Sequence, residues 1–290
     1  MKVKFRLVGL LFFIGVTFQN CQKKSIDVYL IGGQSNATGQ GYIANLPEGF
    51  MINQQVLLFH SDLLEGGVPY KWQPLCPASE DSQKFGVELS LGNTLQEFYP
   101  TKKIALIKHA YSGSSLYKDW NPGNDSNDSL NFGKQFKFFL KTVNKGLTLL
   151  REQGYVPEVK AMFWQQGEKD ARDNAGIENS KIYGNNLNHF IHRVRAQFEA
   201  ESMLFLYGYV LPVPLERYIG REEVRHAQSK VDQNSGHRLA VENAFVIETD
   251  DLPLRFDEPN SPFPDDKVHF NTYGILELGK RFAEKYIKEG

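Results

Sequence analysis

The chain has 290 residues, 41% of them hydrophobic and 23% charged, which supplies enough apolar area for a folded core and excludes a disordered protein. Lys and Arg total 33 against 34 Asp and Glu, so no overall charge attracts nucleic acid or an anionic membrane surface. We therefore expect a neutral or modestly charged small molecule as the partner, and this length suits one α/β domain.

The first residues have the layout of a secretory signal. Three cations among the first six residues precede an apolar run from Leu7 to about Phe18, which is short for a bilayer span. Cys21 follows and resembles the lipidated cysteine of bacterial lipoproteins, although the residues before it are larger than usual. We expect 1–21 to be a signal peptide and the protein to be exported, either periplasmic or anchored to a bacterial membrane through Cys21 alone.

After this segment, short β-rich runs alternate with longer amphipathic ones. The predicted strands are 27–31, 56–59, 104–108, 159–164, 203–209 and 245–248. The predicted helices are 87–98, 136–153, 182–198, 222–233 and 272–288. This alternation predicts βαβ crossovers, with a parallel sheet, helices on both faces and ligands at the carboxyl ends of the strands. No linker divides 22–290, so we expect a single domain there.

The first predicted strand runs into IGGQSNATGQG, where glycines flank Ser35 on both sides. A serine just past a strand, at the start of a helix, exposes its hydroxyl and leaves its backbone N–H free to donate. The loop alone is ambiguous, because glycine-rich turns after a first strand also hold phosphate groups. The P-loop is excluded, since no Gly-Lys-Ser/Thr follows.

Near the other end of the chain, DDKVHFNTYG places Asp266 three residues before His269, directly ahead of the last predicted helix. A serine hydroxyl becomes a good nucleophile when an imidazole accepts its proton, and that imidazole needs an acceptor on its other nitrogen. Asp266 and His269 can meet both needs within one turn. Asp265 is the competing carboxylate, and the three-residue spacing favours Asp266. We interpret the other six histidines as surface or packing residues.

Five separated motifs resemble, in the same order, those of the SGNH/GDSL hydrolases, and within them the sialate O-acetylesterase-like group that includes the acetylxylan esterases of carbohydrate esterase family six. The motifs are GQSN (33–36), FGVEL (85–89), KHAYSGSSLYKDW (108–120), WQQGEKDA (164–171) and DKVHFNTYG (266–274). The resemblance covers nearly all of 26–286. It departs from the family at Val87, Ser112 and Lys169, where proline, glycine and serine are usual. It implies a three-layer α/β/α sandwich with a parallel, flavodoxin-like sheet.

The resemblance also implies a serine esterase that removes O-acetyl groups from carbohydrate, of acetylxylan or sialate type. Ser35 matches the catalytic serine, and the terminal block supplies His269 as base and Asp266 as acid. The reaction then passes through an acetyl-serine that water hydrolyses. We expect no cofactor and no metal, and an acetylated oligo- or polysaccharide as the partner; the particular sugar stays open.

The remaining motif residues concern the oxyanion that forms when the acetyl carbonyl is attacked. The resemblance places the backbone N–H of Gly113 in the oxyanion hole, and Gln166 matches the glutamine that replaces an asparagine of other SGNH enzymes. With the N–H of Ser35 these make three donors, each worth about 10²–10³ in rate. Glu168, two residues beyond Gln166, is expected to orient the site, and its alternative is a salt bridge to a nearby cation.

Three other functions remain open from the sequence. The same residues could act on another acyl group as a lipase or thioesterase, but the loops beside the motifs hold polar and aromatic residues that suit sugars better. These residues are Tyr111, Tyr117, Trp120, Asn124 and Asp125. A non-catalytic carbohydrate-binding member of the fold is disfavoured because Ser35, Asp266 and His269 are all present. Flavin or nucleotide binding would explain only the first loop.

Overall fold

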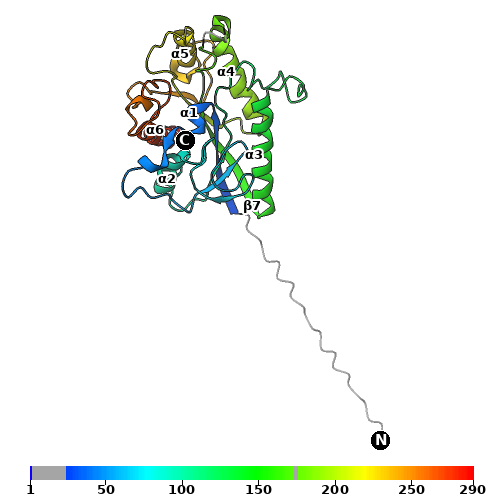
Figure 1. Cartoon of the computed structure of the whole chain (residues 1–290). Helices are drawn as coiled ribbons and strands as arrows, with labels where there is room; N and C mark the ends of the chain where they lie inside the picture. The colour runs from blue at the N-terminus through cyan, green and yellow to red at the C-terminus, as the bar shows by residue number, and fades with distance from the viewer. Residues whose placement is uncertain (2–23, 173–175) are drawn as a thin grey trace.

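The computed structural model describes Met1 and residues 24–172 and 176–290 (Figure 1). The predicted signal peptide beyond Met1, with Cys21, lies outside the described residues. Within the described part of the chain, no helix is both long enough and apolar enough to cross a bilayer.

The centre of the fold is a seven-stranded sheet with the order β4-β3-β6-β1-β7-β8-β9. The strands are β1 (Lys24–Gly33), β3 (Leu57–His60), β4 (Gln73–Pro74), β6 (Ile104–Lys108), β7 (Tyr155–Gln165), β8 (Leu204–Gly208) and β9 (Ala244–Ile247). Every neighbouring pair is parallel except β3 and β4. Without the β3–β4 edge, the order by sequence is 2-1-3-4-5, which is that of flavodoxin. The predicted sheet type is therefore confirmed.

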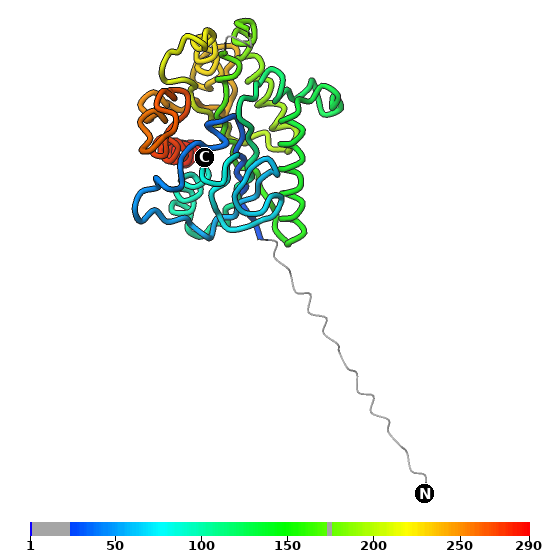
Figure 2. Tube along the Cα trace, in the orientation of Figure 1, coloured from blue at the N-terminus to red at the C-terminus, as the bar shows by residue number. Residues whose placement is uncertain are grey.

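Helices cover both faces of this sheet (Figures 1 and 2). They are α2 (Glu88–Phe98), α3 (Lys134–Glu152), α4 (Ile177–Gln197), α5 (Arg221–Val231) and α6 (Thr272–Glu289). Successive strand residues point to opposite faces. On β1, Val28 and Leu30 therefore pack with α3, α4 and α5, whereas Tyr29 and Ile31 pack with α2 and α6. This arrangement confirms the predicted three-layer sandwich.

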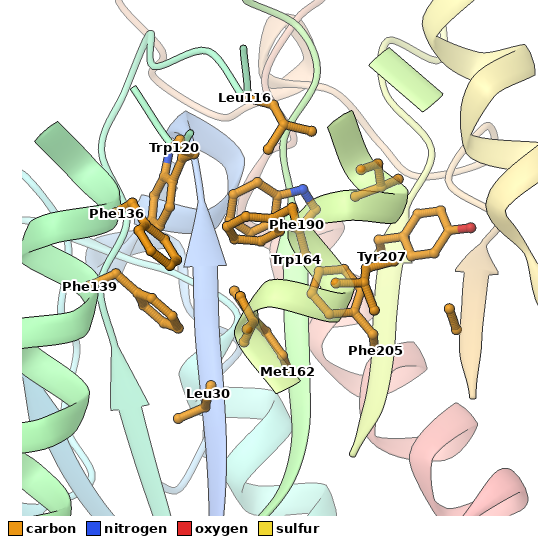
Figure 3. Packing of buried hydrophobic residues seen from close by; sticks show 14 of the residues in the cluster. Leu30, Leu116, Trp120, Phe136, Phe139, Met162, Trp164, Phe190, Phe205 and Tyr207 are labelled. Atoms are coloured by element: carbon orange, nitrogen blue, oxygen red, sulfur yellow. The ribbon is translucent and has the colours of Figure 1, made fainter. Parts of the chain in front are cut away.

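The larger core contains an aromatic cluster beneath the loop that follows β6 (Figure 3). Trp120 and Trp164 are fully buried there, with nearly perpendicular rings whose centroids lie 4.9 Å apart. The indole N–H of Trp120 donates to Ser114 Oγ at 2.8 Å. The expectation that Trp120 contributes to sugar stacking is thus wrong, because the ring packs in the core. Tyr111 and Tyr117, from the same loop, are exposed.

Candidate active site

The candidate site lies at the carboxyl ends of β1 and β7. These strands pair from Lys24 opposite Tyr155 to Gly33 opposite Gln165. Because β6 lies on the other side of β1, this is the point where the strand order reverses, and sheets of this type bind ligands there. The two chain segments that leave these strand ends carry GQSN and WQQGE, so the fold brings two of the predicted motifs together.

The turn after β1 holds Ser35 in a sharp strand-to-helix connection. Gly33 has φ +135°, and a Cβ at this position would lie 2.1 Å from the carbonyl oxygen of Gln165, so only glycine fits. Ser35 then opens the short helix α1 (Ser35–Thr38). Its side chain is largely buried, and its N–H makes no hydrogen bond within the described residues. The turn therefore presents both a hydroxyl and a free donor.

Ser35, His269 and Asp266 form a continuous chain of hydrogen bonds. Ser35 Oγ lies 2.9 Å from His269 Nε2, and His269 Nδ1 lies 2.7 Å from Asp266 Oδ2. A carboxylate can only accept, so the proton resides on Nδ1 and Nε2 is the acceptor for the serine hydroxyl. Residues 234 positions apart in sequence thus form the arrangement that activates a serine for attack.

Asp266 is held as a carboxylate. Burial raises the pKa of Asp266, but the hydrogen bond from His269 and those from backbone N–H groups outweigh this effect and bring its pKa below the usual value. The N–H donors are those of Val268 at 3.0 Å and His269 at 3.2 Å, both to Oδ1. Asp265, the competing carboxylate, is exposed to solvent. The geometry therefore selects Asp266 as the partner of the imidazole.

Asn36, which follows Ser35, fixes the segment that carries His269. Its amide nitrogen donates to the carbonyl of Val268 at 3.1 Å, and its amide oxygen accepts from the N–H of Phe270 at 3.1 Å. The residues on both sides of His269 are thus attached to the turn that carries the serine. Sequence reasoning missed this role, although Asn36 belongs to the GQSN motif.

Glu168 is buried beside these residues and lines the same cavity. Its Oε1 accepts a hydrogen bond from the Asn36 amide at 3.0 Å. The alternative expectation for Glu168 was a salt bridge to a cation at this position. Burial raises the pKa of Glu168, opposed by hydrogen bonds and by the nearby His269. Glu168 thus contacts the residue that positions the histidine segment.

The loop with Gly113 faces Ser35 across the cavity. Gly113 has φ +68°, a left-handed conformation that favours glycine, and its N–H makes no hydrogen bond within the described ranges. Two acidic side chains hold the loop: Glu80 accepts from the N–H of Ser112 at 2.8 Å, and Asp170 accepts from those of residues 116 and 117 at 2.8 and 3.1 Å. Burial raises the pKa of Asp170 to about 6. The loop that carries the free N–H of Gly113 is therefore fixed by hydrogen bonds on both sides of this residue.

Gln166 occupies a different place from the one expected. It is fully buried and is not among the residues that line the cavity. Its amide nitrogen lies 2.6 Å from Asp170 Oδ2, 3.1 Å from the Ser114 carbonyl and 3.3 Å from Gln34 Oε1. Its hydrogens are thus directed at protein acceptors, so the structure does not place Gln166 among the oxyanion donors. The motif fixed its position at the strand end but not the direction of its side chain.

The cavity above Ser35 has a volume of about 350 Å³. Among the twelve described residues that line it, Val268 is the one aliphatic side chain. Three cations, Lys169, Arg172 and Arg217, line it together with the single carboxylate of Glu168. Sequence reasoning missed this cationic lining, because the three residues lie on two different loops. The charged side chains of the lining are therefore suited to a ligand with a negative charge.

Comparison with known proteins identifies the class of enzyme. The family model of the carbohydrate esterases described as sialic acid-specific acetylesterase matches residues 25–288. The chain belongs to this family, which makes it a carboxylic ester hydrolase that removes acetyl groups from carbohydrate. The resemblance to the sialate O-acetylesterase-like group, predicted from the five motifs, is thereby confirmed.

Individual relatives are distant in sequence but similar in fold. A probable carbohydrate esterase of Arabidopsis thaliana is 24% identical over 280 residues, which is 90% of each chain. The crystal structure of an Arabidopsis thaliana protein has a TM-score of 0.67 at 19% identity and covers 91% of this chain and 99% of its own. The crystal structure of NanS has a TM-score of 0.64 at 13% identity and covers 92% and 98%. These likenesses show a shared fold.

Proposed function

We propose that this carbohydrate acetylesterase uses Ser35 as its nucleophile and passes through an acetyl-serine intermediate. The observation that supports this most directly is the unbroken path of hydrogen bonds from Ser35 Oγ through His269 to Asp266, with distances of 2.9 and 2.7 Å. Asn36 orients the site by fixing the chain on both sides of the histidine, and Glu168 supports this role by accepting a hydrogen bond from the Asn36 amide.

The reaction has two halves. In the first, His269 Nε2 accepts the proton of Ser35 as Oγ attacks the acetyl carbonyl, and the imidazolium then donates that proton to the departing sugar oxygen. In the second, His269 accepts a proton from water, the resulting hydroxide attacks the acetyl-serine, and the proton returns to Ser35 as acetate leaves. Asp266 stays ionised throughout and stabilises the imidazolium.

The oxyanion of each tetrahedral intermediate needs donors near Ser35. Ser35 and Gly113 both line the cavity, and their backbone N–H groups have no hydrogen-bond partner among the described residues. We assign them as the oxyanion donors, and each such donor is worth about 10²–10³ in rate. Gln166 acts indirectly in this scheme, because its amide and the loop N–H groups bind the same Asp170 carboxylate. A fixed loop makes a donor effective, since no reorganisation is needed during the reaction.

We propose an acidic sugar ester as the substrate. Lys169, Arg172 and Arg217 surround the cavity, and the Nε of Arg172 is buried without a hydrogen-bond partner among the described residues. A sugar carboxylate would supply the missing acceptor and charge, as O-acetyl sialic acid does and neutral acetylated xylan does not. A long acyl chain is disfavoured as substrate, because four of the twelve described lining residues are charged: Glu168, Lys169, Arg172 and Arg217.

The substrate proposal predicts a charge-dependent loss of affinity. Arg172→Met and Arg217→Met should each raise KM for O-acetyl sialic acid about tenfold, which corresponds to one charge-assisted hydrogen bond. Both variants should hydrolyse neutral 4-nitrophenyl acetate like the parent. The measurement is acetate release from O-acetyl sialic acid, acetylated xylan oligosaccharides and 4-nitrophenyl acetate, butyrate and octanoate.

Lys280→Met, on the exposed surface of α6, is the control for these arginine variants and should change none of the rates. An unchanged KM for O-acetyl sialic acid in both arginine variants, or a preference of the parent for xylan oligosaccharides, would refute the acidic sugar. Faster turnover of octanoate than of acetate would instead favour the lipase alternative.

We also propose that the protein is exported, on the basis of the cationic and apolar segments in residues 1–21. Mass spectrometry of the mature amino terminus should find cleavage, either before a lipidated Cys21 or without a lipid. If Cys21 carries a lipid, the Cys21→Ser variant should no longer be found in the membrane fraction. A full-length chain that retains the apolar run in the cytosolic fraction would contradict export.

A further inference from the structure

The loop between β9 and α6 contributes a buried arginine that touches both halves of the catalytic arrangement. We propose that Arg255 is a positioning residue, which joins the Ser35 turn to the Asp266–His269 turn and places a positive charge beside the Asp266 carboxylate. This inference rests on the proposed use of Ser35, His269 and Asp266 in catalysis. The guanidinium itself does not line the cavity, so Arg255 acts through other residues.

The guanidinium connects the two turns by direct contacts. Its Nη1 donates to Gln40 Oε1 at 3.0 Å and lies 3.5 Å from Asp266 Oδ2. Gln40 in turn directs its amide nitrogen at the carbonyl of Ser35, at 3.4 Å. Nη2 donates to the hydroxyl of Tyr42 at 2.6 Å. The positive group is thus held between the carboxylate of one turn and a residue attached to the other.

The backbone beside Arg255 repeats this connection. The N–H of Arg255 donates to the carbonyl of His269 at 2.7 Å, and the N–H of Phe256 donates to the carbonyl of Asp266 at 2.9 Å. The segment that carries the arginine is therefore paired with the segment that carries the acid and the base. A shift of the guanidinium would be transmitted to both catalytic side chains.

The surroundings of Arg255 make its charge effective. The residue is 4% exposed, and its guanidinium lies over the ring of Phe263 at 4.2 Å and that of Tyr42 at 5.3 Å. Water screens a charge poorly in such a setting, so its effect on a group 3.5 Å away is larger than at the surface. Asp266 is the carboxylate that forms an ion pair with this guanidinium in the described structure.

The charge of Arg255 lies beside the carboxylate that binds His269. Loss of this charge would leave the negative charge of Asp266 less compensated, so the acid limb of kcat/KM should move to a higher pH. The other charged or titratable groups near the pair keep their side chains when Arg255 is substituted, and Asp81 is a further carboxylate on which the charge of Arg255 acts. The groups near the pair are Glu168, Lys169, Arg172 and Arg217 around the imidazole and Asp265, Lys267 and Tyr218 around Asp266. The position of the acid limb of kcat/KM therefore reports the charge of Arg255, whereas the maximal value of kcat/KM also depends on how the side chain packs.

The test compares pH profiles for 4-nitrophenyl acetate in the parent, Arg255→Met, Arg255→Gln and Arg255→Lys. The two neutral variants should lose about tenfold or more in kcat/KM, with the acid limb moved upward by about 0.5–1 pH unit. Arg255→Lys should have an intermediate rate with the limb in place, because it keeps the charge but not the planar fork. Two neutral variants are compared because, if one of them does not fold, the other still tests the effect of removing the charge.

Arg225→Met is the matched control. Arg225 also binds a carboxylate, that of Asp250, and lies over an aromatic ring, that of Tyr209, but it does not line the cavity. The Arg225→Met variant should have the same kcat/KM and the same pH profile as the parent. An unmoved acid limb in the folded neutral variants, or a limb that moves in Arg255→Lys, would overturn the inference. A Ser35→Ala variant as active as the parent would instead contradict the proposed function.

Discussion

Replacement of Ser35 by alanine should reduce kcat for acetate release by about 10⁵–10⁶, the loss known when a serine hydrolase loses its nucleophile. The hydroxyl oxygen is the atom that becomes acylated, and it lies 2.9 Å from His269 Nε2, which accepts its proton. Binding of the sugar should change little, because the neighbouring cations remain. The two quantities are measured by acetate release and by calorimetric titration with a slowly hydrolysed ester.

Two controls make the Ser35 result specific. Ser229→Ala, on α5 and outside the cavity, should retain the parental rate. Acid-quenched parent enzyme should carry the mass of one acetyl group on the peptide that contains Ser35, and the alanine variant should not. A rate for Ser35→Ala within tenfold of the parent would show that another residue performs the attack.

Replacement of Lys108 by methionine should reduce the free energy of unfolding by about 3–5 kcal/mol, the usual cost of leaving one partner of a buried ion pair uncompensated. Lys108 and Glu88 are both fully buried, with Nζ 2.5 Å from Oε2. Nζ also donates to the carbonyls of Thr38 at 2.8 Å and Ala78 at 2.6 Å. Thr38 ends the helix that Ser35 begins, so the lysine stabilises the nucleophile turn as well as the core.

Thermal unfolding provides the measurement for Lys108, with an expected fall in Tm of about 5–15 °C for a domain of this size. Lys181→Met, at an exposed ion pair on α4, should leave Tm unchanged. The double variant Lys108→Met with Glu88→Leu should regain part of the loss, because it buries no lone charge. It should not regain all of it, since Glu88 Oε1 also accepts from two backbone N–H groups. A single variant as stable as the parent would contradict this account.

The regular elements were predictable from the sequence because their signals are local. Four of the six predicted strands begin and end within one residue of those observed. β1 begins three residues earlier than predicted, and β7 begins at Tyr155 rather than 159. Its first residues are half-exposed and include a proline and a glutamate, so their composition does not indicate a strand. They are strand because the first residues of β1 pair with them.

The candidate site was predictable where two residues that contact each other belong to the same short motif. Asp266 and His269 lie within one turn of each other, so their spacing alone indicated their contact. The direction of the Gln166 amide, the burial of Trp120 and the contact of Arg255 with Gln40 depend on residues from other strands and loops. No pattern within a short window contains that information, because packing of distant segments decides which way these side chains point.

The direction of β1 determines how the enzyme can be attached to a solid support. This strand runs for ten residues from Lys24 to Gly33, and at about 3.3 Å per residue it separates its first residue from the Ser35 turn by about 30 Å. A tag joined ahead of Lys24 therefore emerges at the amino-terminal end of β1, and the catalytic cavity lies at the opposite end of this strand. Enzyme coupled to beads through such a tag presents the cavity to solution, where a bulky glycan can reach it.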